Sequence, residues 1–176
     1  MRFFRHINVW VLISLLWLGI VSVRYRGELP PLRQFPWWDA ITPPHLLWSR
    51  PATAPNGKPW PATSGYIPGY SRLNVSGHVD VVADNSGSLN DVLVKLYDRD
   101  RKPMAPVRVA YVRAKEKFTM AQVKPGHYDV RYLDLTTGVI KKSQPLTVKE
   151  DLGWTVGLYG VVDGTQQHQE IAKRDF

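Results

Sequence analysis

The hydrophobic positions of the chain follow two patterns, one continuous and one alternating. Residues 7–23 form an uncharged, predominantly apolar run with arginines on both sides. Between residues 76 and 162, short segments of alternating apolar and polar positions are separated by turn-forming residues. A continuous run is typical of a membrane-spanning helix, and alternation is typical of a strand with one buried face. The pattern therefore predicts an N-terminal membrane segment followed by an all-β domain.

We expect residues 7–23 to be a retained signal-anchor behind a short basic tail at 1–6. The run lies at the short end of the roughly 17–25 residues that cross a bilayer. A cleaved signal peptide would have a shorter apolar core and a small-x-small site, whereas this run ends in Ile20-Val21-Ser22-Val23. A buried helix of a soluble protein would carry a polar stripe, which the run lacks. Both alternatives stay open, and the lipid bilayer is the first expected partner.

Residues 24–72 are expected to form a stalk rich in proline and tryptophan. The part from 28 to 70 holds ten of the fourteen prolines, which exclude long regular elements. It also holds four of the seven tryptophans, Trp37, Trp38, Trp48 and Trp60, although a plain linker would be polar. In one interpretation the rings form a docking surface, because Trp is enriched at binding hot spots and at membrane interfaces. In the other, the segment folds back and the rings cap an open edge of the domain.

The alternating region predicts seven strands within a domain at 73–164, followed by a polar tail at 165–176. The predicted strands are 77–82, 92–97, 106–112, 117–121, 127–133, 139–148 and 154–162. The fifth alternates most regularly, with Tyr128, Val130 and Tyr132 expected inside and Asp129 and Arg131 outside. Pro145 interrupts the sixth and marks an edge or a bulge. Short strands joined by turns predict a seven-stranded antiparallel β-sandwich.

A set of spaced residues within this domain resembles a known family. The residues are Gly77-x-Val79, Asp84-x-x-Gly87-x-Leu89, Val92-x-Val94-x-Leu96, Phe118-x-Met120 and Val123-x-Pro125-Gly126-x-Tyr128-x-Val130. Over about residues 76–150 they resemble the carboxypeptidase regulatory-like domain of the transthyretin-like sandwich class. The pattern departs at Ala114-Lys115-Glu116-Lys117, where a Thr-Asp and a turn glycine are usual. The resemblance implies a transthyretin-like or Ig-like sandwich that serves as a spacer, a folding aid or a binding surface, and it supplies no catalytic residues.

The distribution of charge and the absence of cysteine narrow the expected location. Of the formal charge of +8, residues 1–72 contribute eight Lys or Arg against two acidic residues, and residues 73–176 contribute fifteen against thirteen. A nearly neutral domain argues against a nucleic-acid partner, and basic residues beside the membrane segment suit anionic headgroups. A chain without cysteine has no thiol chemistry and no thiolate metal site. We expect a single-pass protein of the bacterial inner membrane with its C-terminal domain outside the cytoplasm.

The sequence contains no local grouping that indicates catalysis, a cofactor or a metal. The five histidines are too scattered for a metal motif, the run Asp98-Arg99-Asp100-Arg101 is typical of a solvated turn, and neither a Gly-x-Ser-x-Gly motif nor a phosphate-binding loop is present. Asp129, Arg131 and Asp134, with Lys141 and Lys142, predict an exposed charged face. The candidate binding residues are therefore Trp37, Trp38, Trp48, Trp60, Tyr97, Arg99, Asp129 and Arg131.

These observations favour a non-enzymatic, membrane-anchored envelope protein without a cofactor, whose exported domain binds or assembles with a protein or an envelope polymer. Two other functions stay open. A hydrolase acting on glycan or peptide would need convergent carboxylates or a buried histidine in a deep pocket. A structural subunit of a larger membrane complex would bury the stalk tryptophans against its neighbours.

Overall fold

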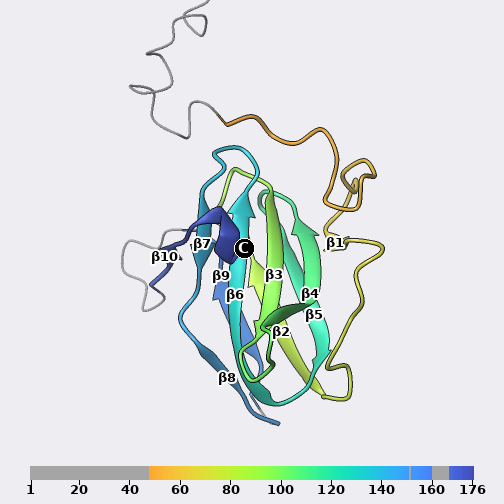
Figure 1. Ribbon diagram of the computed structural model, residues 1–176, viewed down its shortest axis with the longest axis vertical. Helices are drawn as coiled ribbons and strands as arrows, with labels where there is room; N and C mark the ends of the chain where they lie inside the picture. Colours follow the sequence, from red (N-terminus) through yellow and green to blue (C-terminus); the bar gives the residue numbers. More distant parts are fainter. Residues whose placement is uncertain (1–47, 151, 160–166) are drawn as a thin grey trace, which may run out of the picture. The chain divides into compact units, whose positions relative to one another are not determined.

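A computed structural model describes residues 48–150, 152–159 and 167–176 (Figure 1). All of these residues belong to one compact unit, Pro44–Phe176. The expected membrane segment at 7–23, together with Trp37 and Trp38, lies outside the described residues. Among the residues that are described, no helix is long and apolar enough to cross a membrane.

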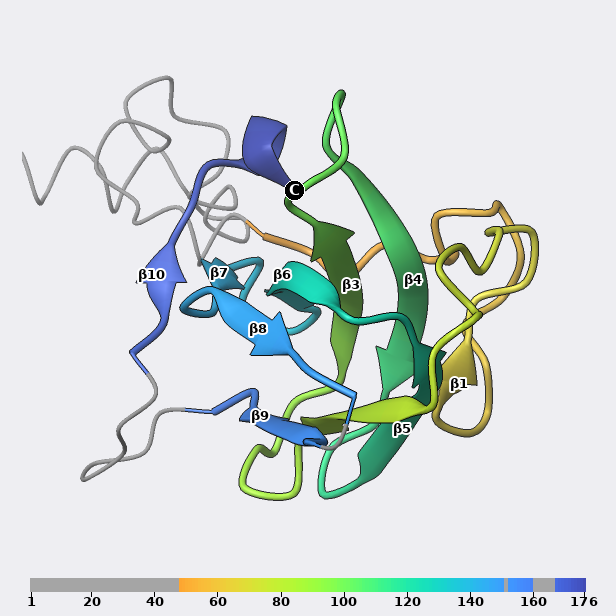
Figure 2. The ribbon, with the colours of Figure 1, turned by 90° about the horizontal axis from the view of Figure 1, so that it is seen from below.

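The described residues form an all-β fold of two sheets. The elements are β1 (Gly65–Tyr66), β2 (Val79–Asp84), β3 (Val92–Asp98), β4 (Ala105–Val112), β5 (Lys117–Val123), β6 (Gly126–Asp134), β7 (Ile140–Lys142), β8 (Leu146–Val148), β9 (Trp154–Gly157), β10 (Gln169–Glu170) and a short 3-10 helix, η2 (Lys173–Asp175). The larger sheet has the order β1-β4-β3-β6-β7-β10, and β8 also pairs with β6. The smaller sheet has the order β5-β2-β9 and forms a second layer beside the larger one (Figure 2).

The two sheets face each other across the main hydrophobic core. Alternate positions of β3 and β6 supply its larger side, among them Val94, Leu96 and Val130, all 0% exposed. Val81 of β2 and Met120 of β5 pack from the smaller sheet. The inward face predicted for the strand at 127–133 is confirmed, because Tyr128, Val130 and Tyr132 all belong to this core.

The prediction of seven antiparallel strands is wrong in two respects. The described residues contain ten strands, and β9 runs parallel to β2, with Val81 opposite Trp154. The strand predicted at 139–148 is divided into β7 and β8 around Pro145, which lacks the N–H that a continuous ladder needs. Ser143 bridges the break, since its Oγ accepts a hydrogen bond from the N–H of Val130 at 3.0 Å. This contact keeps both short strands attached to β6.

A second hydrophobic cluster covers the opposite face of the larger sheet, which we call the outer face. Leu93 of β3, Val109 of β4 and Leu133 of β6 point to this side and are buried. They are covered from two directions, by residues 48–67 and by residues 171–176 (Figure 1). Parts of the expected stalk and of the expected polar tail therefore belong to the compact unit, on both sides of the range 73–164. The outer face carries apolar side chains that need this cover.

Candidate functional site

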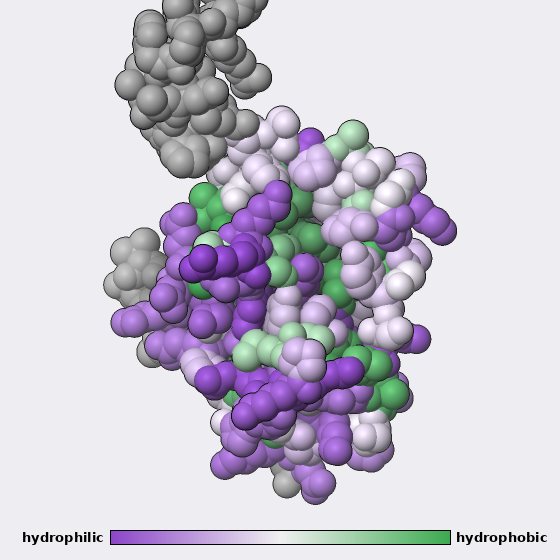
Figure 3. All heavy atoms as spheres, viewed as in Figure 1, coloured by the Kyte–Doolittle hydropathy of each residue, from purple (hydrophilic) through white to green (hydrophobic). Residues whose placement is uncertain are grey.

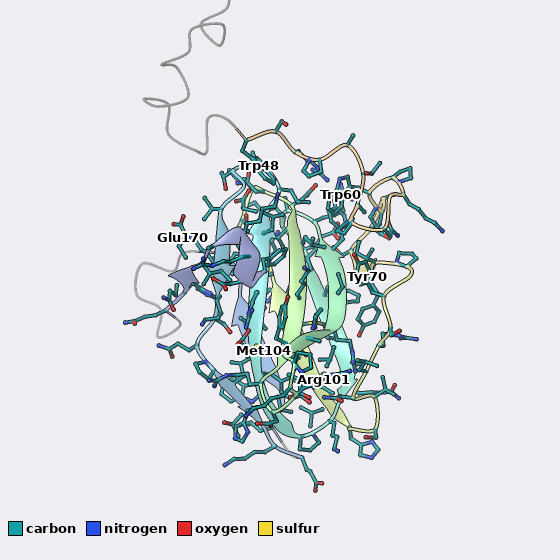
Figure 4. The ribbon with its side chains drawn as sticks, in the orientation of Figure 1. Trp48, Trp60, Tyr70, Arg101, Met104 and Glu170 are labelled. Carbon is teal, nitrogen blue, oxygen red and sulfur yellow. The ribbon has the colours of Figure 1, made fainter. Side chains whose placement is uncertain are left out.

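The outer face brings together the candidate residues that the structure describes. Trp48 and Trp60 lie in the segment that crosses one end of this face (Figure 4). Tyr97 belongs to β3, and Arg99 follows that strand. Asp129 lies opposite Tyr97 on β6, and Arg131 lies opposite Lys95. The described candidate residues, which the sequence indicated for different reasons, therefore lie on one surface.

Trp48 lines an apolar pocket of about 390 Å³ on this face. Its indole Nε1 donates a hydrogen bond to the carbonyl of Leu135 at 3.1 Å. Its ring lies against Gly138, where a Cβ would meet a ring carbon at 2.4 Å and where φ is +74°. Both conditions require glycine at this turn. Trp48 is consequently held in one place rather than projecting freely from a stalk.

The lining of the pocket comes from three separate parts of the chain. Its apolar lining combines Trp48 with Leu133 and Ile140 of the sheet and with Ile171 and Phe176 of the C-terminal segment. Figure 3 views the outer face and shows apolar atoms exposed between the polar C-terminal segment and residues 48–67. Glu170 and Lys173 are also part of the lining. An apolar centre with a charged rim is typical of protein interfaces.

Trp60 occupies a different position, against Tyr111 of β4. Their ring centroids are 5.6 Å apart, and the guanidinium of Arg50 lies 5.4 Å from the Trp60 ring. The indole Nε1 donates to the carbonyl of Pro51 at 2.8 Å. These contacts fit the interpretation in which the aromatic rings fold back onto the domain.

Tyr97, Lys95 and Arg131 hold the end of the C-terminal segment. The main-chain oxygen of Phe176 accepts hydrogen bonds from Tyr97 Oη at 2.5 Å and from Lys95 Nζ at 2.8 Å. Arg131 Nη1 donates to the main-chain oxygen of Asp175. The ammonium of Lys95 also lies 4.1 Å from the centre of the Phe176 ring. Burial lowers the pKa of Lys95, and the neighbouring charge of Arg131 lowers it further.

Asp129 is buried, although the sequence predicted an exposed charged face here. Its carboxylate accepts a hydrogen bond from Arg131 Nε at 2.8 Å, and its side chain is only 5% exposed. The guanidinium carbon of Arg131 lies over the Tyr97 ring, 4.0 Å from its centre. Stacking and pairing among these neighbours, together with the C-terminal segment above them, remove the carboxylate from water.

Arg99 lies beside a second, more polar pocket of about 500 Å³. Lys142, Gln144 and residues 167–169 also line it. The sequence predicted Arg99 and Asp129 as binding residues, but it did not indicate Gln144, Gln167 or Gln169. Gln167 and Gln169 reach this place because β10 pairs with β7, with Gln169 opposite Lys142. A two-residue strand has no periodicity that a sequence could reveal.

The described histidines lie on separate elements. Within the part of the chain that the structure describes, no group of three or more His, Cys, Asp or Glu could hold a metal. His127 Nδ1 lies 3.1 Å from both carboxylate oxygens of Asp100, and both side chains are more than half exposed. The N–H and the imidazole of His127 hold the pKa of Asp100 below its usual value. This pair places Asp100, a residue of the predicted turn, beside a histidine.

Comparisons with known proteins add no relative to this description. No family model matches the chain, and neither a curated protein nor a solved structure matches it. The resemblance of residues 76–150 to carboxypeptidase regulatory-like domains therefore stays a prediction from the residues that carry it.

Proposed function

We propose that this chain is a membrane-anchored protein of the bacterial envelope, and that its exported domain is a non-catalytic module for binding or assembly. In this proposal the two facing sheets form a transthyretin-like sandwich of the carboxypeptidase regulatory-like kind. The apolar run at 7–23 supplies the anchor in this proposal. The outer face supplies the binding surface.

The apolar pocket beside Trp48 is the observation that carries the proposal. Its volume of about 390 Å³ falls within the range of sites that take a side chain or a small molecule. The walls carry few groups that could bind sugar hydroxyls, while Glu170 and Lys173 can pair with charges on an opposing protein surface. The occupant that fits best is an aromatic or aliphatic side chain of a protein partner in the same membrane or envelope.

A charge placed inside this pocket tests the proposal. Val139 lines the pocket and is half-buried, and Val75 is a matched control because it is 49% exposed and lies outside the lining. Full-length protein is crosslinked in its native membrane, solubilised in mild detergent and recovered with its partners. Val139→Glu should reduce recovery of the specific partner at least tenfold with an unchanged melting temperature, and Val75→Glu should not.

Two results would contradict the proposal. Equal partner recovery with Val139→Glu and with the wild type would show that the apolar pocket is not the contact surface. Loss of the cellular phenotype on His127→Ala or Asp100→Asn, with partner recovery unchanged, would instead favour a hydrolase built around that exposed pair.

A further inference from the structure

The polar pocket beside Arg99 is lined mainly by charged and amide side chains, unlike the apolar pocket beside Trp48. Its volume of about 500 Å³ is enough for a ligand of one or two sugar units. Four parts of the chain meet there: Arg99 after β3, Asp129 of β6, residues 142–145 from the end of β7 onward, and residues 167–169 at β10. The pocket is therefore formed by segments that are distant in the sequence.

The pocket holds an excess of positive charge. The one carboxylate among its described lining residues, Asp129, is already paired with Arg131, whose Nε and Nη2 lie 2.8 and 3.3 Å from the two oxygens. Arg99 Nε is 4.0 Å from Asp129, too far for a hydrogen bond, and the Arg99 side chain is 41% exposed. Across residues 48–150, 152–159 and 167–176, the ammonium of Lys142 forms no ion pair. Among the described lining residues, Lys142 and Arg99, whose ion-pair contact with Asp129 is this long one, are therefore available to an anion.

The rest of the lining provides neutral hydrogen-bonding groups. Gln144, Gln167 and Gln169 each offer a carboxamide that both donates and accepts, and all three are exposed. Burial lowers the pKa of His168, and the charge of Lys141 lowers it further, against a hydrogen bond with the main chain of Gly157 that raises it. His168 Nδ1 is buried without a hydrogen-bond partner among the described residues. An array of neutral donors and acceptors around two cations suits a ligand that is both acidic and rich in hydroxyls.

We propose that this pocket binds the uronic acid units of an acidic polysaccharide. The inference rests on the proposed binding function of the outer face and names a second ligand for it. The planar fork of Arg99 can take a carboxylate in a bidentate manner, and Lys142 adds a second charge. The three glutamine side chains then bind the sugar hydroxyls. An acidic peptide would supply a carboxylate and main-chain amides to the same groups, so N-acetylaspartate is the competing probe in the test.

Binding of simple sugars to the full-length protein in detergent tests this assignment. The probes are glucuronate, glucose as its neutral counterpart, inorganic phosphate and N-acetylaspartate, and binding is followed by ligand-observed NMR. Glucuronate should bind at least tenfold more tightly than glucose, and 0.5 M NaCl should weaken its binding. It should also bind more tightly than phosphate or N-acetylaspartate.

Paired variants connect the binding to the pocket. Arg99→Gln and Lys142→Gln should each weaken glucuronate binding at least tenfold. Arg101→Gln and Lys149→Gln are matched controls, because both residues are exposed cations outside the lining, and they should leave binding unchanged. Both pocket residues are at least partly exposed, so these variants should keep the wild-type melting temperature.

Each remaining outcome overturns the assignment. Equal binding of phosphate would make the pocket a general anion site, and equal binding of N-acetylaspartate would favour an acidic peptide. Absence of glucuronate binding, or binding unaffected by Arg99→Gln and Lys142→Gln, would remove the site altogether. None of these results depends on Val139→Glu, so failure of the sugar assignment and failure of the protein-binding proposal are separable.

Discussion

Arg50 Nη1 lies 2.7 Å from Asp91 Oδ2, and this ion pair fastens the proline-rich segment to the larger sheet. The same carboxylate oxygen accepts a hydrogen bond from Tyr111 Oη at 2.6 Å. Its second oxygen accepts from the N–H of Ala114 at 2.9 Å. Asp91 therefore joins the segment, β4 and the loop after β4 at one point. Residues that would otherwise extend away from the domain are fixed over its outer face.

The ionisation of Asp91 should contribute to the pH dependence of stability. Burial opposes ionisation, but hydrogen bonds from Tyr111, Ala114 and Arg50 outweigh it and hold the pKa of Asp91 below its ordinary value of 3.8. A carboxyl whose pKa is lowered by folding stabilises the protein above its unfolded pKa. This contribution is lost as the pH falls below about 3.8 and through the lower folded pKa.

Urea unfolding from pH 7 to pH 2.5 measures this contribution. Asp91→Asn should be less stable than the wild type at pH 7, and the difference should shrink as the pH falls below about 4. Asp80→Asn is the control, because Asp80 is exposed on β2. A stability difference for Asp91→Asn that stays constant across this range would contradict the role assigned to its ionisation.

The alternation of apolar and polar residues at 127–133 predicted the inner core, because the polarity of each residue there indicates the face of the strand on which it lies. Tyr128, Val130 and Tyr132 are apolar in every second position, and any strand with that pattern buries those side chains together. Leu93 and Val109 lie in the outer cluster. Alternation assigns Leu93 to solvent, and it places Val109 on the same face as Val107, which belongs to the main core. Local alternation therefore does not identify the outer-cluster residues. Their cover comes from residues distant in sequence and without periodicity.

The candidate site was only partly predictable for the same reason. Arg99, Asp129 and Arg131 could be named because they lie in or beside one recognisable strand or hairpin. Lys95 and Phe176 meet 81 residues apart, through the packing of an irregular segment on β3. The parallel pairing of β2 with β9 likewise joins strands that are distant in the sequence, so no local pattern predicts it. Local pattern sets the type of an element but not its neighbours.

Substitutions at Val130 should distinguish loss of packing from burial of a charge. Val130 is 0% exposed in the main core. Val130→Ala removes two methyl groups and should lower the free energy of unfolding by about 2 kcal/mol. Val130→Asp places an unpaired charge there and should abolish cooperative unfolding. Circular dichroism and urea titration measure both, and Val75→Asp, at a 49% exposed position, should match the wild type.

Arg108 should contribute strongly to the stability of the fold, although no carboxylate pairs with it among the described residues. Its side chain is 0% exposed. Its Nη1 donates to the carbonyls of Leu73 and Val107, and its Nη2 lies 3.2 Å from the carbonyl of Gln122. One guanidinium thus joins residues 73–74, β4 and β5.

Replacing Arg108 with methionine keeps the volume and removes these donors. Buried carbonyls that lose their partners should make Arg108→Met less stable by about 2–4 kcal/mol in urea titration. Arg113→Met is the control, because Arg113 is 49% exposed in its pair with Glu116 and should change stability by less than about 0.5 kcal/mol. Equal stability of Arg108→Met and the wild type would show that the carbonyl contacts contribute nothing net.

The ring of Phe176 should determine whether the C-terminal segment stays on the outer face. It packs into the outer cluster and lies over the ammonium of Lys95. Phe176→Ala removes both contacts and should let residues 169–176 detach. Trypsin cleavage after Lys173 and Arg174, followed by mass spectrometry, should then accelerate at least fivefold, while cleavage after Arg72 stays constant. Unchanged cleavage after Lys173 would show that Phe176 does not hold the segment.

The apolar run at 7–23 should keep the full-length protein in the membrane. It carries no charge and ends without a small-x-small cleavage site, so a retained anchor is expected rather than a removed signal peptide. After washing with alkaline carbonate, the protein should remain in the membrane pellet. Protease added from the outer side should release a fragment that begins within residues 24–43, because the compact unit begins at Pro44. Recovery of a soluble mature form beginning near Arg24 or Arg26 would instead establish cleavage, and the binding proposals would then apply to a released domain.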